Sequence, residues 1–407
     1  MISLAPRLGT PCAPKHPPVA VRASPEFPRR HLPLPTSCLV WLCLSAIVSA
    51  PGQVRGAAAY PEPIATYLAR LYSPGTQPLA YRADYPGGFA SWQHDARAAL
   101  RARLELGRIA ASVGTHRSTV EMDPPVDCGD YTRQSGSIET EPGLRIPFWL
   151  LQPKRSRPWP LALFPHGHDR RGHDTTAGIY ADAAQEKKAI AEDRDVAVQA
   201  VKRGFLALAP ATRGISTHIV PDLEGRHGER DCRSHVIHCL LAGRTAIGER
   251  VWDLQRLLDW ALQLPGVDTR HVLVMGNSGG GMVTMFAAAV DERISVAVPS
   301  CSFAPSASAS GYIFHCDCNT VPGLMDLGGL PGVVGLAAPR HVLAVNGRKD
   351  PLFSVAEIDR AAAQVRAIFA GAGTPAHFQH RWGNEGHRFY QHLMWPFVLE
   401  AMTRRQP

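Results

Sequence analysis

One serine of the chain lies in a pattern that could make it a nucleophile. Ser278 has Gly276 two residues before it and Gly280 two residues after it. An apolar, strand-like run (residues 271–275) precedes this pattern, and a helical run begins at about Gly280. A nucleophile on a tight strand-to-helix turn needs small neighbours, because the backbone is strained and nearby segments approach closely. The pattern therefore predicts a catalytic serine, with a merely structural glycine turn as the alternative.

Two later residues could complete a catalytic triad with this serine. A serine hydroxyl is a poor nucleophile unless a histidine accepts its proton and a carboxylate orients that histidine. After such a turn the expected chain order is serine, acid, histidine. Asp350 follows the apolar run 341–345, and His387 follows the last strand-like run, 376–382. Since ligands bind at the carboxyl ends of strands in open parallel sheets, we expect Asp350 to be the acid and His387 the base.

Both residues have rivals. Asp350 could simply cap the turn that follows it, and Asp326 is another carboxylate, although no strand precedes it. His377 and His380 compete with His387, but they lie inside the last expected strand rather than at its end. Position along the chain therefore favours Asp350 and His387.

Backbone N–H groups near the serine could stabilise the oxyanion of a tetrahedral intermediate. One candidate is the N–H of Gly279, directly after the serine. The other donor should come from the loop after an earlier strand, and residues 163–168 (LFPHGH) have the required form. We assign this second donor to His168, with Gly167 as the near alternative.

Two groups of residues carry metal-binding side chains without a strong metal-binding spacing. They are residues 166–169 (HGHD) with His173, and residues 316–318 (CDC). Imidazole, carboxylate and thiolate groups are all metal ligands. No second paired-cysteine motif completes four ligands around residues 316–318, however. A hydrolase with a complete serine triad requires no metal, so we expect neither a metal nor another cofactor.

Alternating apolar strands and helical stretches surround these residues and predict an α/β fold. Strand-like runs at 131–139 and 144–151 predict an initial β-hairpin. Short, continuously apolar strands that alternate with helices indicate a mainly parallel sheet with helices on both faces. The later strands are expected at residues 161–164, 204–208, 271–275, 294–298, 341–345 and 376–382, and the helices at 191–203, 248–264, 280–290 and 355–370.

The chain is expected to have three parts. Residues 1–57 form a leader, 58–130 a helical N-terminal extension, and 131–407 the catalytic α/β domain. Within the extension, residues 91–110 have apolar positions at helical spacing and an arginine-rich polar face. This pattern predicts one helix that packs on a larger body.

The leader has the outline of a signal peptide. Its basic, proline-rich start leads to the apolar stretch 38–48 and then to small residues. This stretch is too short to span a bilayer as a helix, which needs about 20 residues. We therefore expect a secreted or periplasmic protein with no stable membrane association after processing. A buried N-terminal helix is the alternative.

Most of the positive charge lies at the start of the chain. The formal net charge is +8, and residues 1–60 contribute +5 of it, from six arginines and lysines against one glutamate. No basic run interleaved with aromatic residues occurs in the body of the chain. We therefore expect no nucleic-acid partner.

Six of the nine cysteines follow the leader. An even number in an exported protein permits disulfides, although spacing does not determine their pairing. Cys232 with Cys239, and Cys301 with either Cys316 or Cys318, are reasonable pairs. Free buried thiols are the alternative.

Several segments together resemble one family. They are PHGH at 165–168, GRT at 243–245 with GERVWD at 248–253, GNSGGG at 276–281, HCDCN at 315–319 with VPG at 321–323, NGRKDP at 346–351, and GHRFY at 386–390. Over residues 92–397 the chain is similar to the dienelactone-hydrolase-like and acetyl-xylan-esterase-like branch of the α/β-hydrolases. The resemblance implies an eight-stranded, mainly parallel sheet, no cofactor, and hydrolysis of small acyl esters, often on carbohydrate.

The chain also departs from parts of this family's pattern. Dienelactone hydrolases proper use a cysteine nucleophile, whereas Ser278 favours simple esters. Related enzymes carry an Arg-Gly pair that is matched here by Arg213-Gly214, and Arg213 either binds substrate or makes a structural ion pair. Residues 217–238 fit the family less well, so the rim of the pocket is expected to differ.

The sequence therefore predicts a serine carboxylic-ester hydrolase that acts on a small-molecule or carbohydrate ester. One alternative is a serine peptidase of the prolyl-oligopeptidase type, which has the same triad order and usually carries a propeller domain. The roughly 110 mature residues before His166 are too few for a propeller. A non-catalytic binding module on the same fold is the other alternative, and the complete triad argues against it.

Overall fold

The computed structural model describes residues 60–403. The expected leader, residues 1–57, lies outside these residues together with its apolar stretch 38–48. Among the described helices, none has both the length and the apolar character that a membrane span requires.

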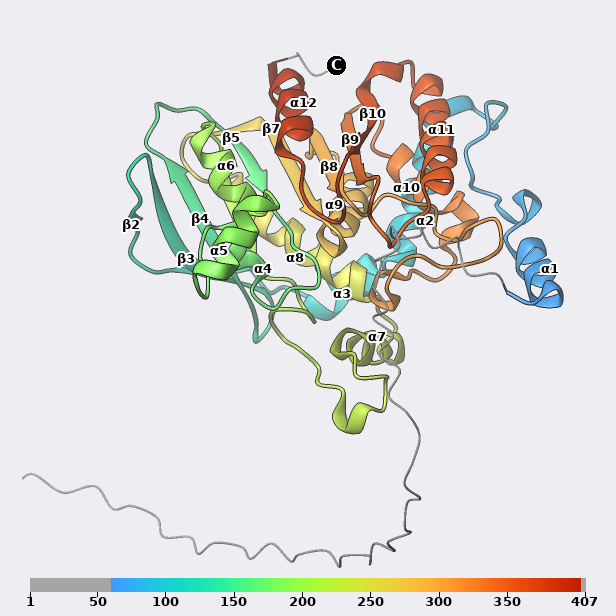
Figure 1. Ribbon diagram of the computed structural model, residues 1–407, viewed down its shortest axis with the longest axis horizontal. Coiled ribbons are helices and arrows are strands. Elements are labelled where there is room, and N and C mark those ends of the chain that lie inside the picture. The colour runs from blue at the N-terminus through green and yellow to red at the C-terminus, as the bar shows by residue number, and fades with distance from the viewer. Residues whose placement is uncertain (1–59, 404–407) are drawn as a thin grey trace, which may run out of the picture. The chain divides into compact units, whose positions relative to one another are not determined.

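Ten strands of the described residues form one mixed sheet, in the order β1-β3-β4-β6-β5-β7-β8-β9-β10 with β2 beside β3 (Figure 1). Strands β6, β5, β7, β8, β9 and β10 are parallel, and β1 to β4 contribute antiparallel pairs. The strands are β1 (Val120–Met122), β2 (Val126–Asp127), β3 (Tyr131–Glu141), β4 (Leu144–Pro153), β5 (Trp159–Leu163), β6 (Leu206–Pro210), β7 (Val267–Asn277), β8 (Val296–Ser300), β9 (His341–Gly347) and β10 (Phe378–Gly383).

The predicted α/β class is confirmed, but the sheet has two strands more than expected. The eight expected strands correspond to β3 through β10. The extra strands β1 and β2 come from residues 120–127, which were expected to belong to a helical extension. They form because both pair antiparallel with β3 and so extend the sheet beyond it.

Helices cover both faces of the sheet and divide the buried core in two. Along β7, Val272 and Val274 enter one core while Leu273 and Met275 enter the other, because successive side chains of a strand alternate between faces. The first core includes residues of α2, α3, α8, α9, α10 and α11, and the second includes residues of α6 and α12. The helices are α1 (Glu62–Leu71), α2 (Gly88–Arg103), α3 (Leu106–Val113), α4 (Gly172–Thr176), α5 (Ala183–Ala191), α6 (Val196–Lys202), α7 (Asp231–Leu241), α8 (Ala246–Ala261), α9 (Gly279–Val290), α10 (Gly329–Gly335), α11 (Val355–Gly371) and α12 (Gln391–Thr403).

The single helix expected over residues 91–110 is wrong, since α2 and α3 are separate helices. Between them Glu105 has a φ of 57°, a left-handed conformation that interrupts a right-handed helix. The break allows Trp92 and Leu100 of α2 and Ile109 of α3 to be fully buried in the same core. Burial of these apolar side chains therefore outweighs the helical spacing of the segment.

The side chain of His380 is held in a largely apolar part of the sheet. It lies in β10, with its ring centroid 6.0 Å from that of Phe303 and 4.8 Å from that of Trp382. Its Nε2 is 3.2 Å from Oδ1 of Asn346. Burial lowers the pKa of His380 to about 4, although the charge of Asp359 raises it slightly. Hence this imidazole is neutral in the fold.

We expect His380 to make the fold sensitive to acid. The unfolded chain protonates this histidine below its ordinary pKa of 6.5, whereas the fold protonates it only near pH 4. Its contribution to stability is therefore complete above pH 6.5 and is lost as the pH falls toward 4, by about 3 kcal/mol. Urea unfolding at several pH values should show a loss that is about 3 kcal/mol larger in the wild type than in His380→Gln, because the other buried histidines remain in both proteins. The surface variant His392→Gln should behave as the wild type, and equal pH dependence in all three proteins would contradict the assignment.

Candidate active site

Ser278 occupies a sharp turn between β7 and α9. Its φ of 56° and ψ of −123° lie in a region that residues other than glycine rarely adopt. A Cβ atom on Gly276 would lie 2.4 Å from the carbonyl carbon of Gly280, and one on Gly280 would lie 2.0 Å from the carbonyl oxygen of Pro165. Contacts this short are sterically forbidden, so the turn requires both glycines.

His387 and Asp350 lie together at the carboxyl ends of neighbouring strands. Asp350 follows β9 and His387 follows β10, and these two strands pair in parallel. The Nδ1 of His387 donates a hydrogen bond of 2.7 Å to Oδ2 of Asp350. The other carboxylate oxygen of Asp350 accepts a hydrogen bond of 3.0 Å from the N–H of Leu352. Asp350 is only 4 % exposed, so its carboxylate orients His387 without facing solvent.

A cavity of about 350 Å³ connects the predicted site residues. Ser278 and His387 both line it, together with Gly167 and His168 from the loop after β5. Asp350 lies behind His387 and is not part of the lining. The structure thus brings the serine, the histidine and the predicted oxyanion loop to one cavity at the carboxyl edge of the sheet.

The rival acid and bases lie elsewhere. Asp326 forms an ion pair with Arg103 of α2. The Nδ1 of His377 is 2.5 Å from the carbonyl oxygen of Pro339, and His380 lies within β10. None of these three rivals lines the cavity that contains Ser278.

The loop of residues 165–168 packs directly against the serine turn. A Cβ on Gly167 would lie 3.0 Å from both the backbone nitrogen of Gly279 and the Cβ of Ser278. Within the described residues, the N–H groups of His168 and Gly279 donate to no backbone acceptor. Both N–H groups therefore remain available to an oxyanion beside Ser278.

His166 holds this loop in place, a role that the sequence did not indicate. Its Nδ1 donates to the carbonyl oxygen of Gly167 at 2.8 Å, and its Nε2 accepts from the N–H of Thr212 at 3.1 Å. Burial, followed by the charge of His173, lowers the pKa of His166 to about 3. A neutral ring is required for this pair of hydrogen bonds, because Nε2 must lack a proton.

Two further residues that the sequence did not single out support the loop of His387. The Nδ2 of Asn277 donates to the carbonyl oxygen of Arg388 at 3.2 Å. The guanidinium of Arg194 donates to the carbonyl oxygen of His387 itself at 3.1 Å. The position of Asn277 beside the serine could have suggested its role. Nothing in the sequence could have suggested the role of Arg194, because it is 193 residues away from His387 in the chain.

The expectation that Arg213 could bind substrate is not supported. Arg213 is 2 % exposed, and it is absent from the residues that line the cavity. Its guanidinium makes ion pairs with Glu141, Glu249 and Asp253. Burial by itself would lower the pKa of Arg213, but the neighbouring carboxylates, first that of Asp253, raise it. Arg213 therefore has a structural role, because its buried positive charge stabilises three buried carboxylates and they stabilise it.

Replacing Arg213 by methionine should destabilise the fold by about 3–5 kcal/mol, because buried carboxylates would lose their cationic partner. Urea unfolding at pH 7 measures this loss. Arg270→Met is the matched control, since Arg270 pairs with Asp268 while its own side chain is 79 % exposed. The control should lose less than about 1 kcal/mol. Similar small losses in both variants would show that the buried network contributes little.

The cysteine pairs expected from the sequence are wrong. Cys239 lies beside His235, with its Sγ 3.5 Å from Nε2, and not beside Cys232. Cys301 packs against the loop of His387, where its Sγ is 3.3 Å from the carbonyl oxygen of Arg388. All six described cysteines are free thiols. Chain segments far apart in sequence decide their neighbours, which is why spacing could not determine the pairs.

Comparisons with known proteins find similar sequences. The sequence profile of the acetyl xylan esterase (AXE1) family matches residues 138–306, a range that includes Ser278 and His168. A candidate hydrolase of Bacillus subtilis (strain 168), YtaP, is 24% identical over 238 residues, which are 56% of this chain and 73% of that protein.

Solved structures share the fold at low sequence identity. A candidate acetyl xylan esterase from Bacteroides fragilis superposes with a TM-score of 0.64 at 17% identity, over 86% of this chain and 97% of that one. A glucuronoyl esterase from Solibacter usitatus superposes with a TM-score of 0.57 at 16% identity, over 81% and 98%. Over residues 138–306 the chain is similar to the acetyl xylan esterase (AXE1) family, and it shares the α/β fold of these esterase structures.

Proposed function

We propose that this protein is an esterase that cleaves small acyl esters, acetyl esters above all, through a triad of Ser278, His387 and Asp350. One observation carries the proposal. Ser278, which lies on a strained turn, and His387 line one cavity. The buried Asp350 accepts a hydrogen bond of 2.7 Å from Nδ1 of His387. These positions support acyl transfer through a serine, in which a carboxylate orients the histidine that takes the proton of the serine.

Each group then has one task in the reaction. The Oγ of Ser278 attacks the ester carbonyl while Nε2 of His387 takes its proton, and Asp350 stabilises the imidazolium. The N–H groups of Gly279 and His168 stabilise the oxyanion. His387 next protonates the leaving alcohol, which leaves an acyl-enzyme. Water then attacks the acyl-enzyme and gives its proton to His387, and the acid departs as the hydroxyl of Ser278 is restored.

The size of the cavity supports a small acyl group. Its volume of about 350 Å³ lies near the lower end of the range for ligand pockets. The related structures are named for esters of carbohydrates, namely acetyl xylan and glucuronoyl esters. We therefore propose acetylated carbohydrate as the natural substrate class, and export through residues 1–57 as the route to it.

A fluorophosphonate probe tests the nucleophile, and a substrate series tests the reaction. We expect one labelled peptide, which carries Ser278, and no labelling after heat unfolding. Among p-nitrophenyl esters, acetate should be hydrolysed at least about tenfold faster than octanoate, because charged and polar side chains such as those of Asp169 and Arg194 line the cavity and give a long alkyl chain little apolar contact. Acetylated xylan should release acetate. A folded protein that no probe labels would instead be a binding module, and cleavage of a peptide amide as well as the ester would indicate a peptidase.

A further inference from the structure

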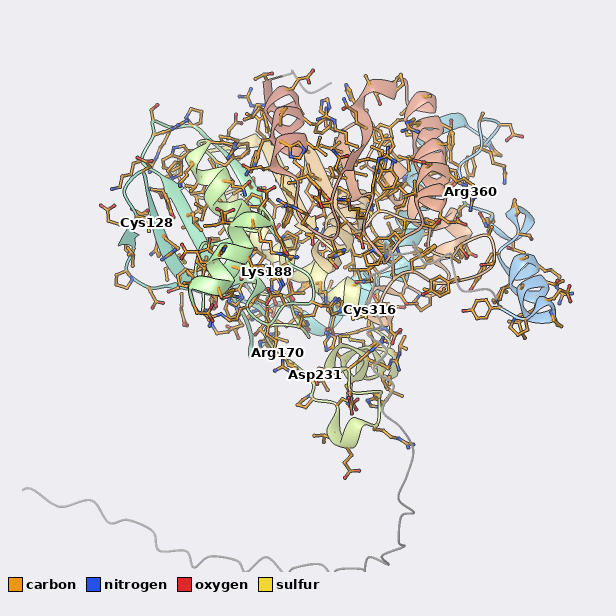
Figure 2. All side chains as sticks on the ribbon, viewed as in Figure 1. Cys128, Arg170, Lys188, Asp231, Cys316 and Arg360 are labelled. Carbon is orange, nitrogen blue, oxygen red and sulfur yellow. The ribbon has the colours of Figure 1, made fainter. Side chains whose placement is uncertain are left out.

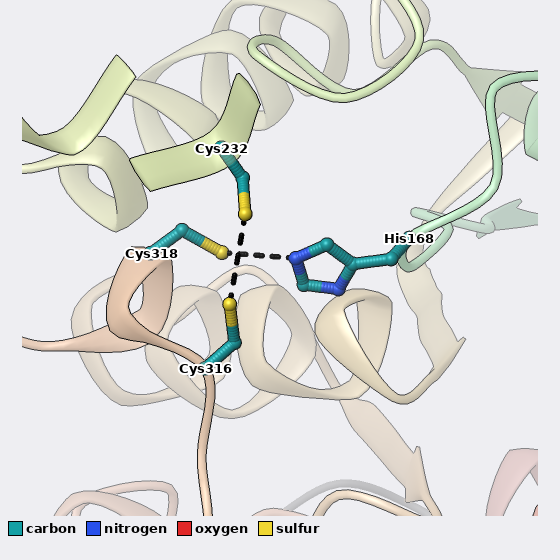
Figure 3. Close-up of side chains that lie close together, drawn as sticks. All are labelled: His168, Cys232, Cys316 and Cys318. Carbon is teal, nitrogen blue, oxygen red and sulfur yellow. Dashed lines mark hydrogen bonds between the residues drawn. The ribbon is translucent and has the colours of Figure 1, made fainter. Parts of the chain in front are cut away.

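Four metal-binding side chains converge beside the candidate active site (Figure 3). They come from separate segments: His168 follows β5, Cys232 lies in the first turn of α7, and Cys316 and Cys318 lie in one loop after β8. Their ligand atoms all lie within 4.8 Å of one another. The Sγ atoms of Cys232 and Cys316 are 3.6 Å apart, and Sγ of Cys318 is 3.2 Å from Nε2 of His168. Cys232 and His168 thus supply the two ligands that the sequence did not place beside residues 316–318.

We propose that these four residues bind one zinc ion. Structural zinc sites take four ligands in a tetrahedron, and three cysteines with one histidine are a common set. With zinc–sulfur distances of about 2.3 Å and zinc–nitrogen distances of about 2.0 Å, neighbouring ligand atoms of a tetrahedron lie about 3.5–3.8 Å apart. The two measured separations, 3.6 and 3.2 Å, are within or close to that range. Thiolate ligands select zinc over calcium and magnesium, which prefer oxygen.

The surroundings favour the negative charge that thiolate ligands carry. Nη1 of the buried Arg250 donates to Sγ of Cys318 at 3.3 Å. The cationic guanidinium of Arg250 therefore favours a thiolate at Cys318. Zinc binding would release the protons of the remaining thiols.

Ion pairs outside the cluster hold its segments together. Arg170, in the loop that carries His168, pairs with Asp231 at the start of α7. Arg233 of α7 pairs with Asp317, which lies between the two cysteines of the loop. Figure 2 labels Arg170 and Asp231 near Cys316. Contacts of the protein itself thus bring the ligands together, as in a preorganised site.

A disulfide between Cys232 and Cys316 is the competing arrangement. Such a bond joins two sulfur atoms at about 2.0 Å. It would use only two of the four side chains and leave Cys318 and His168 with each other and with Arg250 as partners. Zinc uses all four side chains, and for that reason the geometry favours it.

A second cluster in the described residues is weaker. His235, Cys239 and Glu249 also bring their ligand atoms together. This cluster has three ligands rather than four, and the carboxylate of Glu249 is already paired with Arg213 and Arg244. A bound cation would have to displace those pairs, so we propose no metal there.

The zinc would also brace the proposed oxyanion loop, a consequence that rests on the proposed function. Nε2 of His168 points into the cluster, while its Nδ1 would lie 3.6 Å from a Cβ built on Gly279. A metal on Nε2 fixes both the tautomer and the orientation of the ring. His168 would then be a positioning residue through its side chain and an oxyanion donor through its N–H. Removal of the metal should lower kcat about 10- to 100-fold with little change in KM, and zinc should restore it.

Metal analysis of the full chain, purified without chelators, tests the site directly. We expect about one zinc per chain by inductively coupled plasma mass spectrometry. Cys316→Ser and Cys318→Ser should each lose most of it. Cys128→Ser is the matched control and should retain it, because Cys128 lies near β2 and away from Cys316 (Figure 2). X-ray absorption should give three sulfur ligands and one nitrogen, and His168→Cys should retain zinc with four sulfurs.

Two results would overturn the zinc site. One is a folded wild type without zinc that takes up none on dialysis against Zn²⁺. The other is a Cys232–Cys316 disulfide, found by alkylating the denatured protein without reductant. The test of the zinc site is independent of the test of the esterase reaction, because Ser278→Ala should lose activity and keep its zinc. Zinc in a wild type without esterase activity would leave the metal site standing and remove the proposed reaction.

Discussion

Replacing Ser278 by alanine should lower kcat/KM for p-nitrophenyl acetate by about 10⁴- to 10⁶-fold. The expected loss is large because no other group at the turn can form the acyl-enzyme, while the oxyanion donors and the cavity remain. Activity measured on protein of verified fold, together with loss of fluorophosphonate labelling, checks the prediction. Less than tenfold loss would exclude Ser278 as the nucleophile.

Ser302→Ala is a suitable control for this variant. Ser302 is also buried, and its hydroxyl has no hydrogen-bond partner among the described residues. It does not line the cavity, so its removal should leave kcat/KM unchanged. Ser278→Gly adds a test of the strained turn, because glycine adopts the φ of 56° without strain. That variant should be inactive yet more stable than Ser278→Ala by about 1 kcal/mol.

Replacing Asp350 by asparagine should lower kcat by about 10³- to 10⁴-fold, the size of effect seen when the acid of another serine triad is made neutral. The amide has nearly the same shape, and it can still accept a hydrogen bond from the N–H of Leu352. It no longer carries the charge that stabilises a protonated His387, and its NH₂ group favours the wrong tautomer of the ring. The rate of acylation by an aryl acetate, measured before the steady state, gives the loss in the acylation step itself.

The rival acid provides the matched control for this change. Asp326→Asn removes the ion pair with Arg103 but touches no residue that lines the cavity. Its kcat should equal that of the wild type. If Asp326→Asn lost activity and Asp350→Asn did not, the acid of the triad would have been misassigned.

Local rules account for what the sequence predicted well. The glycines at 276 and 280 predicted the strained turn because steric contact between backbone segments leaves no room for a side chain there. Asp350 and His387 could be predicted to meet because successive parallel strands end at the same edge of a sheet. The strand and helix pattern predicted the α/β class for the same reason, since periodicity depends on the residues of one segment alone.

Local rules could not predict where the irregular segments would lie. Residues 217–238 fit the family pattern less well, and yet α7, which begins among them, places Sγ of Cys232 3.6 Å from Sγ of Cys316, 84 residues further along the chain. Arg213 likewise acquires its role from carboxylates on β3 and α8. The left-handed Glu105 divides a helix that its own periodicity predicted to be continuous.

By itself the sequence determined the nucleophile turn, the order of the candidate triad and the class of the fold, because each depends on backbone sterics or on strand ends that meet by rule. Only the tertiary structure decided that His168, assigned from the sequence to the oxyanion, also faces three cysteines. Loops without periodicity are placed by the packing of the whole chain, and that packing brings together ligands that no spacing in the sequence indicates.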